Sequence, residues 1–322
     1  MSKPHDTFQE RAEGFELLGL RSSAGLEARY VPRAGLVCSS LRHAGDELLG
    51  QRGGVRDYAE RGATMGIPIL HPWANRLDGP GFRAGGVEVT FPSDAEAVRL
   101  DGATGLPIHG LVSGWPTWEV VSHGADEKTA HLEAVLEADR LPAVSGLFPF
   151  PHRVRVRAEL CGLTLRIATT LEPTGERAVP VAFGYHPYFT LPGVAREEWD
   201  VGLPVRAQAI LDERFLPTGR EEEVSIPTGP LGGRTYDDLF PELEPDPVFH
   251  VEGGGRRIAV AFEGGYEFGV VYAPDNDAVI CFEPMTAATN PFAGPYPLRW
   301  VEPGETFTAT FAVIVSPSEV EG

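Results

Sequence analysis

The segment HRVRVRAELCGLTLRI, residues 152–167, gives the strongest indication of the fold. Apolar residues alternate with mostly arginine residues in its first half, and the alternation resumes after a Cys-Gly pair. The apolar members are Val154, Val156, Ala158 and Leu160, followed by Leu163, Leu165 and Ile167. A two-residue turn at Cys161-Gly162 would place Leu160 opposite Leu163, so that both apolar sets share one face of a hairpin. The segment therefore predicts two strands of an antiparallel sheet.

Further short apolar runs follow this pattern along the chain, separated by turn residues. They cover residues 87–91, 117–122, 129–136, 257–262, 269–272, 278–282 and 307–315. The 38 glycines and 29 prolines lie between such runs, and helical periodicity is scarce. Many short strands with frequent turns predict an all-β sandwich or barrel. The acidic loops at 219–228 and 241–247 are too short to separate two domains, so we expect one domain over residues 1–322.

Charge and composition narrow the class of partner. The net charge of −19 repels phosphate backbones and anionic membranes, so neither nucleic acid nor a membrane surface is expected as a partner. No stretch reaches 18 uncharged apolar residues, and the acidic first thirty residues do not resemble a signal peptide. Three cysteines in or beside apolar runs, Cys38, Cys161 and Cys281, fit neither a disulfide framework nor a CxxC metal site. These features predict a cytoplasmic, reducing location.

Two histidines next to proline or glycine are candidates for proton transfer. His186 lies in FGYHPYF, where Pro187 favours an extended backbone and the aromatic neighbours could stack on a sugar ring. Since histidine titrates near neutral pH, His186 could donate a proton; the alternative is a core histidine within an aromatic cluster. His109, in GLPIHG, is the second candidate, with an ordinary loop histidine as the alternative.

Two acidic segments supply candidate carboxylates. Glu283 directly follows the apolar run 278–282, where a carboxylate is unusual unless it is paired or functional. It is therefore a candidate general base with an environment that tunes its pKa; alternatively, the strand has ended and Glu283 points to water. Asp237 precedes Asp238 in TYDDLF. Adjacent residues on a strand point to opposite faces, so at most one of the two is expected to enter a site, and a solvated turn is the alternative.

Asn75 and Arg76 follow an apolar stretch in HPWANRL. The arginine offers a fixed fork of donors that suits two vicinal hydroxyls, and a salt bridge to a local acid such as Asp78 is the alternative. The nine histidines include no HxH, HxxH or HExxH pair, and GxSxG and GxGxxG are absent, so we expect no metal, esterase nucleophile or nucleotide cofactor. These candidate residues together indicate acid–base catalysis on a polyhydroxylated small molecule.

Taken together, these segments resemble the aldose 1-epimerase (galactose mutarotase) family. The matching pieces are HPWANRL, the IHG of GLPIHGLVSGW, LFPFPHRVRVRAEL, FGYHPYF, TYDDLF and CFEPMTAATNPF. They occur in the family's order, from about residue 65 to residue 292, and the closing run 307–315 fits as well. The resemblance implies a large antiparallel β-sandwich, the galactose mutarotase-like supersandwich, and interconversion of the α and β anomers of an aldose without a cofactor.

The resemblance also implies a role for each candidate residue. Glu283 matches the general base, His186 the general acid, and His109 a second active-site histidine. The matches to substrate-binding positions are Arg76 and Asp237, with Asn75 beside them. Asp237 is preferred to Asp238 because it stands three residues before an aromatic residue, as in the family. The expected substrate is a free aldohexose such as glucose or galactose.

Three alternatives remain open at this level. A branch of the family acts on hexose 6-phosphates and would need basic residues at the phosphate, for which the chain offers Arg42, Arg52 and Arg56. The acidic net charge and the FGYHPYF segment favour the free-sugar branch. A non-catalytic carbohydrate-binding protein on the same fold would not need both His186 and Glu283. A glycoside hydrolase or lyase would use two carboxylates, roughly 5–9.5 Å apart.

Overall fold

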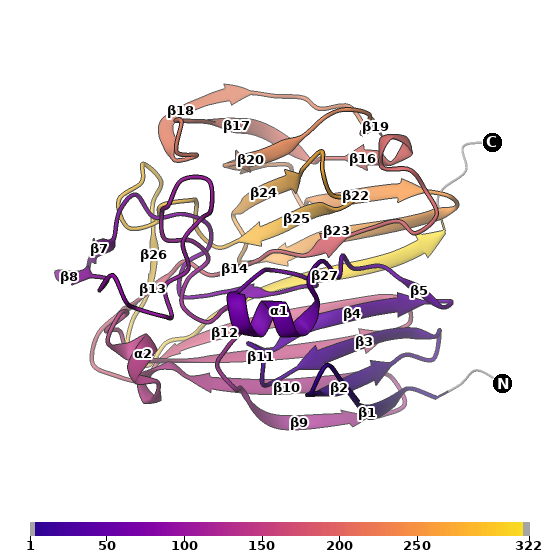
Figure 1. The fold of residues 1–322 in the computed structure, drawn as a ribbon, viewed down its shortest axis with the longest axis horizontal. Coiled ribbons are helices and arrows are strands. Elements are labelled where there is room, and N and C mark those ends of the chain that lie inside the picture. Colours follow the sequence, from indigo (N-terminus) through magenta and orange to yellow (C-terminus); the bar gives the residue numbers. More distant parts are fainter. Residues whose placement is uncertain (1–3, 318–322) are drawn as a thin grey trace.

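The computed structural model describes residues 4–317, which form antiparallel sheets joined by short turns (Figure 1). The largest sheet has nine strands. In spatial order they are β19 (Gly229–Pro230), β16 (Asp200–Gly202), β22 (Val248–Gly253), β23 (Arg256–Gly264), β27 (Phe307–Pro317), β12 (Thr164–Pro173), β11 (His152–Cys161), β10 (Ala130–Glu137) and β9 (Glu119–Ala125). The all-β fold class expected from the sequence is confirmed.

Two further sheets come from the first 47 residues and from residues 69–285, respectively. The five-stranded sheet contains β1 (Asp6–Ala12), β2 (Phe15–Arg21), β3 (Leu26–Val31), β4 (Val37–His43) and β5 (Asp46–Glu47). The six-stranded sheet contains β20 (Tyr236–Phe240), β24 (Phe268–Ala273), β25 (Ile280–Met285), β14 (Gly184–Tyr185) and β6 (Ile69–Leu70), with β15 (Tyr188–Phe189) also paired to β25. Isolated bridges join Cys38 to Ile67 and Leu49 to Phe189, so the two sheets meet edge to edge.

The remaining elements are short. Three smaller sheets comprise β18 (Pro217–Glu223), β17 (Val205–Leu211) and β21 (Glu242–Leu243); β13 (Val179–Val181) and β26 (Arg299–Val301); and β7 (Gly81–Ala84) and β8 (Val87–Thr90). The helical elements are α1 (Gly54–Arg61), α2 (Pro142–Ser145) and the 3-10 turns η1 (Ala138–Arg140) and η2 (Arg196–Glu198). The predicted loop 219–228 lies partly within strand β18, where acidic side chains point to solvent and no apolar alternation marks the strand.

The nine-stranded sheet is one layer of a sandwich, and the five- and six-stranded sheets together form the other. Strands β1, β2 and β3 contact β9, β10 and β11, and β25 contacts β22. A continuous core of aliphatic and aromatic side chains fills the space between the layers, with Phe282, Phe249 and Phe311 almost completely buried. Burying one face of each sheet against the other is what makes a two-layer domain stable.

The hairpin β11–β12 shows the predicted pairing of apolar faces with a different turn. Leu160 lies opposite Leu165, and the two central turn residues are Gly162 and Leu163, so the turn predicted at Cys161-Gly162 is wrong by one residue. Gly162 has a φ of 56°, and a positive φ at the first central position is what a type II′ turn requires. The shift changes the opposite partner by two residues, so every side chain keeps its face. Cys161, expected in an apolar setting, is exposed beside this turn, whereas Cys38 and Cys281 are buried.

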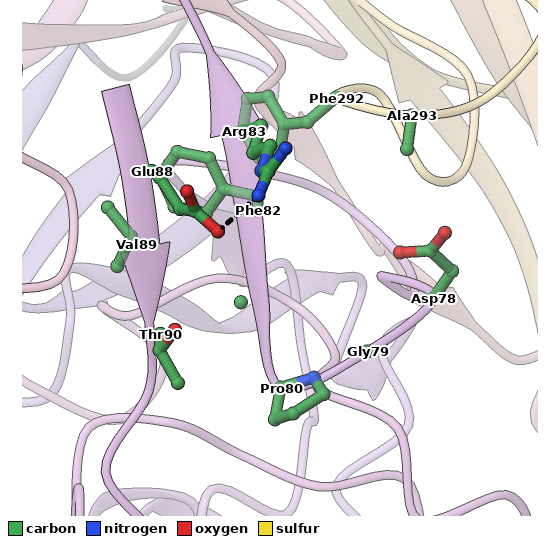
Figure 2. Close-up of a pocket in the computed structure, with 11 residues that line it drawn as sticks. Asp78, Gly79, Pro80, Phe82, Arg83, Glu88, Val89, Thr90, Phe292 and Ala293 are labelled. Atoms are coloured by element: carbon green, nitrogen blue, oxygen red, sulfur yellow. Dashed lines mark hydrogen bonds and ion pairs between the residues drawn. The ribbon is translucent and has the colours of Figure 1, made fainter. Parts of the chain in front are cut away.

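The hairpin β7–β8 forms the wall of a shallow surface pocket of about 350 Å³ (Figure 2). The rings of Phe82 and Phe292 stack at 4.4 Å on its inner side, and Arg83 and Glu88 form an exposed ion pair across the hairpin. None of the candidate residues from the sequence lines this pocket. Within residues 4–317, no helix is both long and apolar enough to cross a membrane.

Candidate active site

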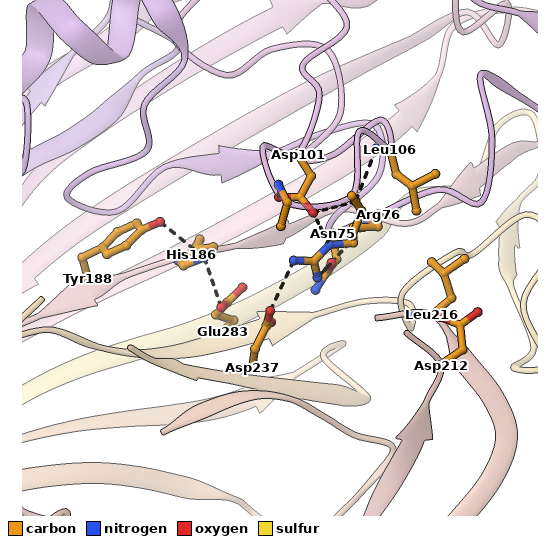
Figure 3. A network of polar contacts seen from close by, with 12 residues as sticks. Asn75, Arg76, Asp101, Leu106, His186, Tyr188, Asp212, Leu216, Asp237 and Glu283 are labelled. Carbon is orange, nitrogen blue, oxygen red and sulfur yellow. Dashed lines mark hydrogen bonds and ion pairs between the residues drawn. The ribbon is translucent and has the colours of Figure 1, made fainter. Parts of the chain in front are cut away.

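A second, strongly polar pocket of about 200 Å³ brings together all six candidate residues. Its lining consists of Arg52, Thr64, Asn75, Arg76, Asp101, Ile108, His109, His186, Tyr188, Asp237, Tyr272 and Glu283. These residues are spread over the sequence from position 52 to position 283, and Figure 3 shows the central ones meeting above the strands. The pocket is therefore a product of the tertiary fold.

The floor of the pocket is one face of the six-stranded sheet. Asp237 on β20 lies opposite Tyr272 on β24, and Glu283 on β25 lies opposite Val270, two residues from Tyr272. Directly paired residues and residues two apart share a face, so Asp237, Tyr272 and Glu283 project to the same side. Phe282, the residue before Glu283 on β25, points to the other side of the sheet and packs into the core. Glu283 is thus within a strand and only 1% exposed, which rules out the alternative that it points to water.

The side chains of the adjacent residues Asp237 and Asp238 point to opposite faces of strand β20, as expected for neighbours on a strand. Asp237 accepts a hydrogen bond from Arg76 at 3.2 Å in the pocket. Asp238 projects from the opposite face of β20, where its Oδ1 accepts a hydrogen bond from Gln208 at 2.7 Å. Of these two adjacent aspartates, only Asp237 lines the pocket.

Two irregular loops form the wall that carries Asn75, Arg76 and His109. The backbone N–H of His109 donates to the Asn75 carbonyl at 3.0 Å, and the N–H of Asn290 donates to the Arg76 carbonyl at 2.9 Å. Asn75, His109 and Asn290 all have φ near 60°, in the left-handed region that only glycine adopts without cost. Such conformations persist where the surroundings impose them, and they are common at functional sites.

The guanidinium of Arg76 is held at its edges by three neighbours. Its Nε donates to Asp101 at 2.9 Å, one terminal nitrogen to Asp237 at 3.2 Å and the other to Asn75 Oδ1 at 3.3 Å. An arginine side chain has five N–H groups, so two remain for a ligand. The expected alternative, a salt bridge to Asp78, is wrong: the partners are Asp101 and Asp237.

His186 and Glu283 are in direct contact at the centre of the pocket. Nε2 of His186 lies 3.3 Å from Oε1 of Glu283, and both side chains are at least nine-tenths buried (Figure 3). Oε2 of Glu283 and Nδ1 of His186 are buried without a hydrogen-bond partner. An acid–base pair with unused polar atoms in a polar pocket is well suited to exchange protons with a ligand.

The surroundings favour the uncharged form of both members of this pair. Burial, followed by the negative charge of Asp237, raises the pKa of Glu283 well above its usual value. Burial, followed by the effects of His109 and Arg52, lowers the pKa of His186 well below 6.5. Both shifts favour a protonated Glu283 and a neutral imidazole across the 3.3 Å contact.

His109 contributes a second imidazole beside the first. Its ring meets that of His186 edge to face, with centroids 5.4 Å apart. Burial, together with the positive charge of Arg76, lowers the pKa of His109 to about 3. A neutral His109 can donate one hydrogen bond and accept another at the pocket wall, but it does not carry a charge near neutral pH.

Behind His186 lies a network whose connections the sequence did not predict. The hydroxyl of Tyr188 lies 3.4 Å from Nε2 of His186 and 2.6 Å from Oγ1 of Thr64, and the rings of His186 and Tyr188 are stacked at 4.4 Å. Arg52 donates to the Tyr188 hydroxyl at 3.3 Å and pairs with Asp277. The aromatic flank of FGYHPYF was a signal for Tyr188, but Thr64 and Asp101 have none in their own segments.

The other two arginines considered for a phosphate lie outside the pocket. Arg42 donates to the carbonyl of Gly45 in a surface turn, and Arg56 contacts Glu13. Among the described residues, no three His, Cys, Asp or Glu side chains are grouped so that they could hold a metal ion.

Comparison with known proteins gives one family match. The family model described as aldose 1-epimerase matches residues 31–313, which include every residue of the pocket. No match was found among the curated protein sequences.

Several solved structures share the fold over almost the whole chain. A galactose mutarotase-like protein from Clostridium acetobutylicum superposes with a TM-score of 0.84 at 18% identity, covering 97% of this chain and 98% of the other. A galactose 1-epimerase from Lactobacillus acidophilus gives 0.76 at 16% identity, with 98% and 99% coverage. An aldose epimerase homologue from C. elegans gives 0.74 at 15% identity, with 94% and 99% coverage. At these identities the similarity establishes the fold alone.

Proposed function

The chain belongs to the aldose 1-epimerase family, and we propose that it interconverts the α and β anomers of a free aldohexose, such as glucose or galactose. The observation that carries the proposal is the direct contact of the buried side chains of His186 and Glu283 in a polar pocket. The ring oxygen and the O1 hydroxyl of a pyranose are bonded to the same carbon. An acid and a base that act on them together must therefore lie side by side, as these two do.

Ring opening requires two coupled proton transfers. Glu283, as the carboxylate, removes the proton from the O1 hydroxyl, and the C1–O1 bond becomes a carbonyl. The bond between C1 and the ring oxygen breaks, and its electron pair stays on that oxygen, which takes a proton from His186. After rotation about C1–C2, the same steps run backwards on the other face of the aldehyde. Positioned groups of this kind each contribute about 10²–10⁴-fold in rate.

The direction of the two pKa shifts matches the open-chain stage of this reaction. At that stage Glu283 holds the proton from O1, and His186 has given its own away, which is the state favoured by burial. Before ring opening, one proton has to pass from Glu283 to His186, and the 3.3 Å contact between Oε1 and Nε2 provides the route. The pair works with a single shared proton.

The charges in the pocket favour a neutral sugar. The guanidinium of Arg76 is balanced by Asp101 and Asp237, and that of Arg52 by Asp277 at 3.3 Å. A phosphate dianion would meet no unbalanced cation there, whereas the two free N–H groups of Arg76 and the oxygens of Asp237 suit neighbouring hydroxyls. The pocket volume of about 200 Å³ is also small for a sugar that carries a phosphate group.

A neighbouring pocket supports a second candidate, a hexose 6-phosphate. It has a volume of about 400 Å³, shares Ile108 and His109 with the first pocket, and is lined by Arg61 and Arg99 without an acidic side chain. A phosphate on a sugar bound beside His109 could extend towards these arginines.

A comparison of three sugars, with wild-type protein and one variant, separates the two candidates. The rate constant for equilibration of freshly dissolved α-D-glucose, α-D-galactose and glucose 6-phosphate is measured with wild-type protein and with Arg99→Gln. The proposal predicts faster equilibration of a free sugar and no effect of Arg99→Gln on it. Acceleration of the phosphate ester alone, lost in Arg99→Gln, would replace the proposal by the second candidate.

A further inference from the structure

The β17–β18 hairpin carries an aromatic ring to the guanidinium of Arg76 from outside the pocket. Cζ of Arg76 lies 4.7 Å from the centroid of the Phe215 ring. Phe215 does not itself line the pocket, so it covers the face of the guanidinium without occupying the space of a ligand. Figure 3 shows Asp212 and Leu216, which bracket Phe215 in the hairpin, close to the loop of Arg76.

The backbone at Phe215 is strained. Its φ is 62°, in the left-handed region that is unfavourable for a bulky aromatic residue. Such a conformation persists only where the surrounding structure imposes it. A glycine at this position would adopt the same turn without the penalty, so the local backbone gives no reason for a phenylalanine.

The turn around Phe215 is built to hold this conformation. Oδ1 of Asp212 accepts hydrogen bonds from the backbone N–H groups of Arg214 at 2.8 Å and Leu216 at 3.0 Å. The N–H of Phe215 donates to the carbonyl of Asp212 at 3.0 Å, and the N–H of Asp212 donates to the carbonyl of Leu216 at 2.8 Å. Leu216 is buried and anchors the tip of the hairpin. The backbone of Phe215 is therefore held in place, with its ring centroid 4.7 Å from Cζ of Arg76.

The contact with Phe215 restrains the tilt of the Arg76 guanidinium, which its hydrogen bonds restrain less. Asp101, Asp237 and Asn75 accept hydrogen bonds from the three nitrogens at the edges of the guanidinium. Contacts to the edges leave the tilt of the plane less restricted, whereas a ring against the face restricts it. The direction of the two remaining N–H groups depends on that tilt.

We propose that Phe215 is a positioning residue for sugar binding: its ring fixes the tilt of the Arg76 guanidinium so that the two free N–H groups meet neighbouring hydroxyls of the substrate. This inference rests on the proposed mutarotase function. The hydroxyls that Arg76 holds are away from the atoms that react. The contact therefore acts on substrate and transition state alike, and its loss raises KM more than it lowers kcat.

The kinetic test compares substitutions that keep or remove the aromatic ring. Phe215→Leu is expected to raise KM about three- to tenfold, the range of a partly exposed cation–π contact, with kcat within about twofold. Phe215→Trp, which keeps the ring, is expected to restore KM. Phe307→Leu is the matched control, because Phe307 makes the same kind of contact with Arg299 at 5.3 Å outside the pocket. It should leave KM unchanged.

Phe215→Gly separates positioning from a structural role. Glycine relieves the strained φ, so the thermal unfolding midpoint should stay the same or rise while KM rises as in Phe215→Leu. A purely structural role predicts the reverse, a lower midpoint with KM unchanged, and that result would overturn the proposal.

A readout that does not depend on turnover keeps the proposal testable by itself. The Nε–H resonance of Arg76, assigned by its disappearance in Arg76→Lys, is expected to shift and to exchange faster with water in Phe215→Leu and Phe215→Gly. If the wild type equilibrates no sugar but the resonance responds in this way, the proposed function fails and the positioning role stands. If the resonance is unchanged in both variants, the positioning role is overturned, whatever the activity.

Discussion

At the scale of single residues, Glu283 combines the features of a reactive group with a cost in stability. It is 1% exposed, one of its oxygens has no partner, and burial raises its pKa. A carboxyl with a raised pKa in the folded state binds its proton more tightly than in the unfolded state. Folding is therefore opposed increasingly as the pH rises above the ordinary value of 4.5.

Replacing Glu283 by glutamine should lower activity and raise stability together. Glu283→Gln removes the base, so kcat for mutarotation is expected to fall about 10²–10⁴-fold, as measured by polarimetry. The same change removes an ionisable group that opposes folding, so the unfolding midpoint should rise at pH 7. At pH 4, where the carboxyl is protonated in both states, this gain should vanish. A gain of equal size at both pH values would contradict the raised pKa.

The ion pair between Arg76 and Asp101 should affect binding strongly. Asp101→Asn weakens the charge-assisted hydrogen bond to Nε and leaves Arg76 less well oriented, so KM is expected to rise about 10-fold or more. Asp78→Asn is the control, because Asp78 is two residues from Arg76 in sequence but makes no ion pair with it. Equal effects of the two substitutions on KM would show that general charge, and not this contact, controls binding.

Asp101 also shows where reasoning from sequence stops. Residues such as His186 and Glu283 stand next to proline in aromatic or apolar runs, and that contrast makes them visible in the sequence. Asp101 lies in a polar, glycine-rich loop in which an acid is unremarkable. Its importance comes from a contact with Arg76, 25 residues away, and a single sequence does not encode such a pairing locally.

At the scale of elements, the pocket depends on a close approach between two loops. Gly110 follows His109 and has a φ of 74°, and a side chain there would place its first carbon 2.2 Å from the carbonyl oxygen of His71. The backbone bridge between His71 and Gly110 holds the loop of His109 against the loop of Arg76. A larger residue at Gly110 must push the two loops apart.

Paired glycine substitutions separate this approach from backbone strain. Gly110→Ala is expected to lower kcat/KM by at least about 10-fold and to destabilise the fold, because the two loops cannot keep their spacing. Gly86→Ala, at a φ of 75° with no atom within 4 Å, carries the same strain in open space. It should lower the unfolding midpoint by a small amount and leave kcat/KM unchanged. Similar activity in the two variants would refute the role of the close approach.

The sequence found two kinds of strand. Strands β11 and β12 are buried on alternate residues, which is the pattern that predicted them. Strands β24 and β25 are buried on both faces and were predicted as continuous apolar runs. Strands β2 and β4 were not predicted, since consecutive residues in both are buried and the alternation is lost. Strand β14 and strand β6 have two residues each, too few for any periodic pattern. Strand β14 pairs with β25 and β6 pairs with β14, so tertiary pairing stabilises both.

At the scale of the whole molecule, buried histidines make stability depend on pH. His152 and His71 lie in the core with their Nε2 atoms 2.7 Å apart, and Nδ1 of His152 donates to the carbonyl of Phe150 at 2.6 Å. One neutral ring therefore donates to the other. Burial lowers the pKa of His152 to about 4 and that of His71 well below 6.5.

Acid should destabilise the protein between pH 6.5 and 4. In this interval the unfolded chain binds protons that the folded core excludes, so stability falls as the pH decreases, by about 3 kcal/mol for His152 alone. The free energy of unfolding in urea at pH 7 and pH 4.5 measures the loss. His152→Gln should reduce the difference between the two pH values, while His43→Gln on the partly exposed end of β4 should not. An identical pH dependence in His152→Gln would contradict this origin.

The central claim is that the contact between His186 and Glu283 moves protons on the anomeric centre of a free aldohexose. The most direct measurement is polarimetry of freshly dissolved α-D-glucose and α-D-galactose with wild-type protein, Glu283→Gln and His186→Asn. The account predicts that wild-type protein accelerates equilibration of at least one of these sugars and that each substitution removes most of the acceleration, with the sugar still bound by Glu283→Gln. Acceleration that persists in Glu283→Gln, or folded wild-type protein that accelerates neither sugar, would contradict it.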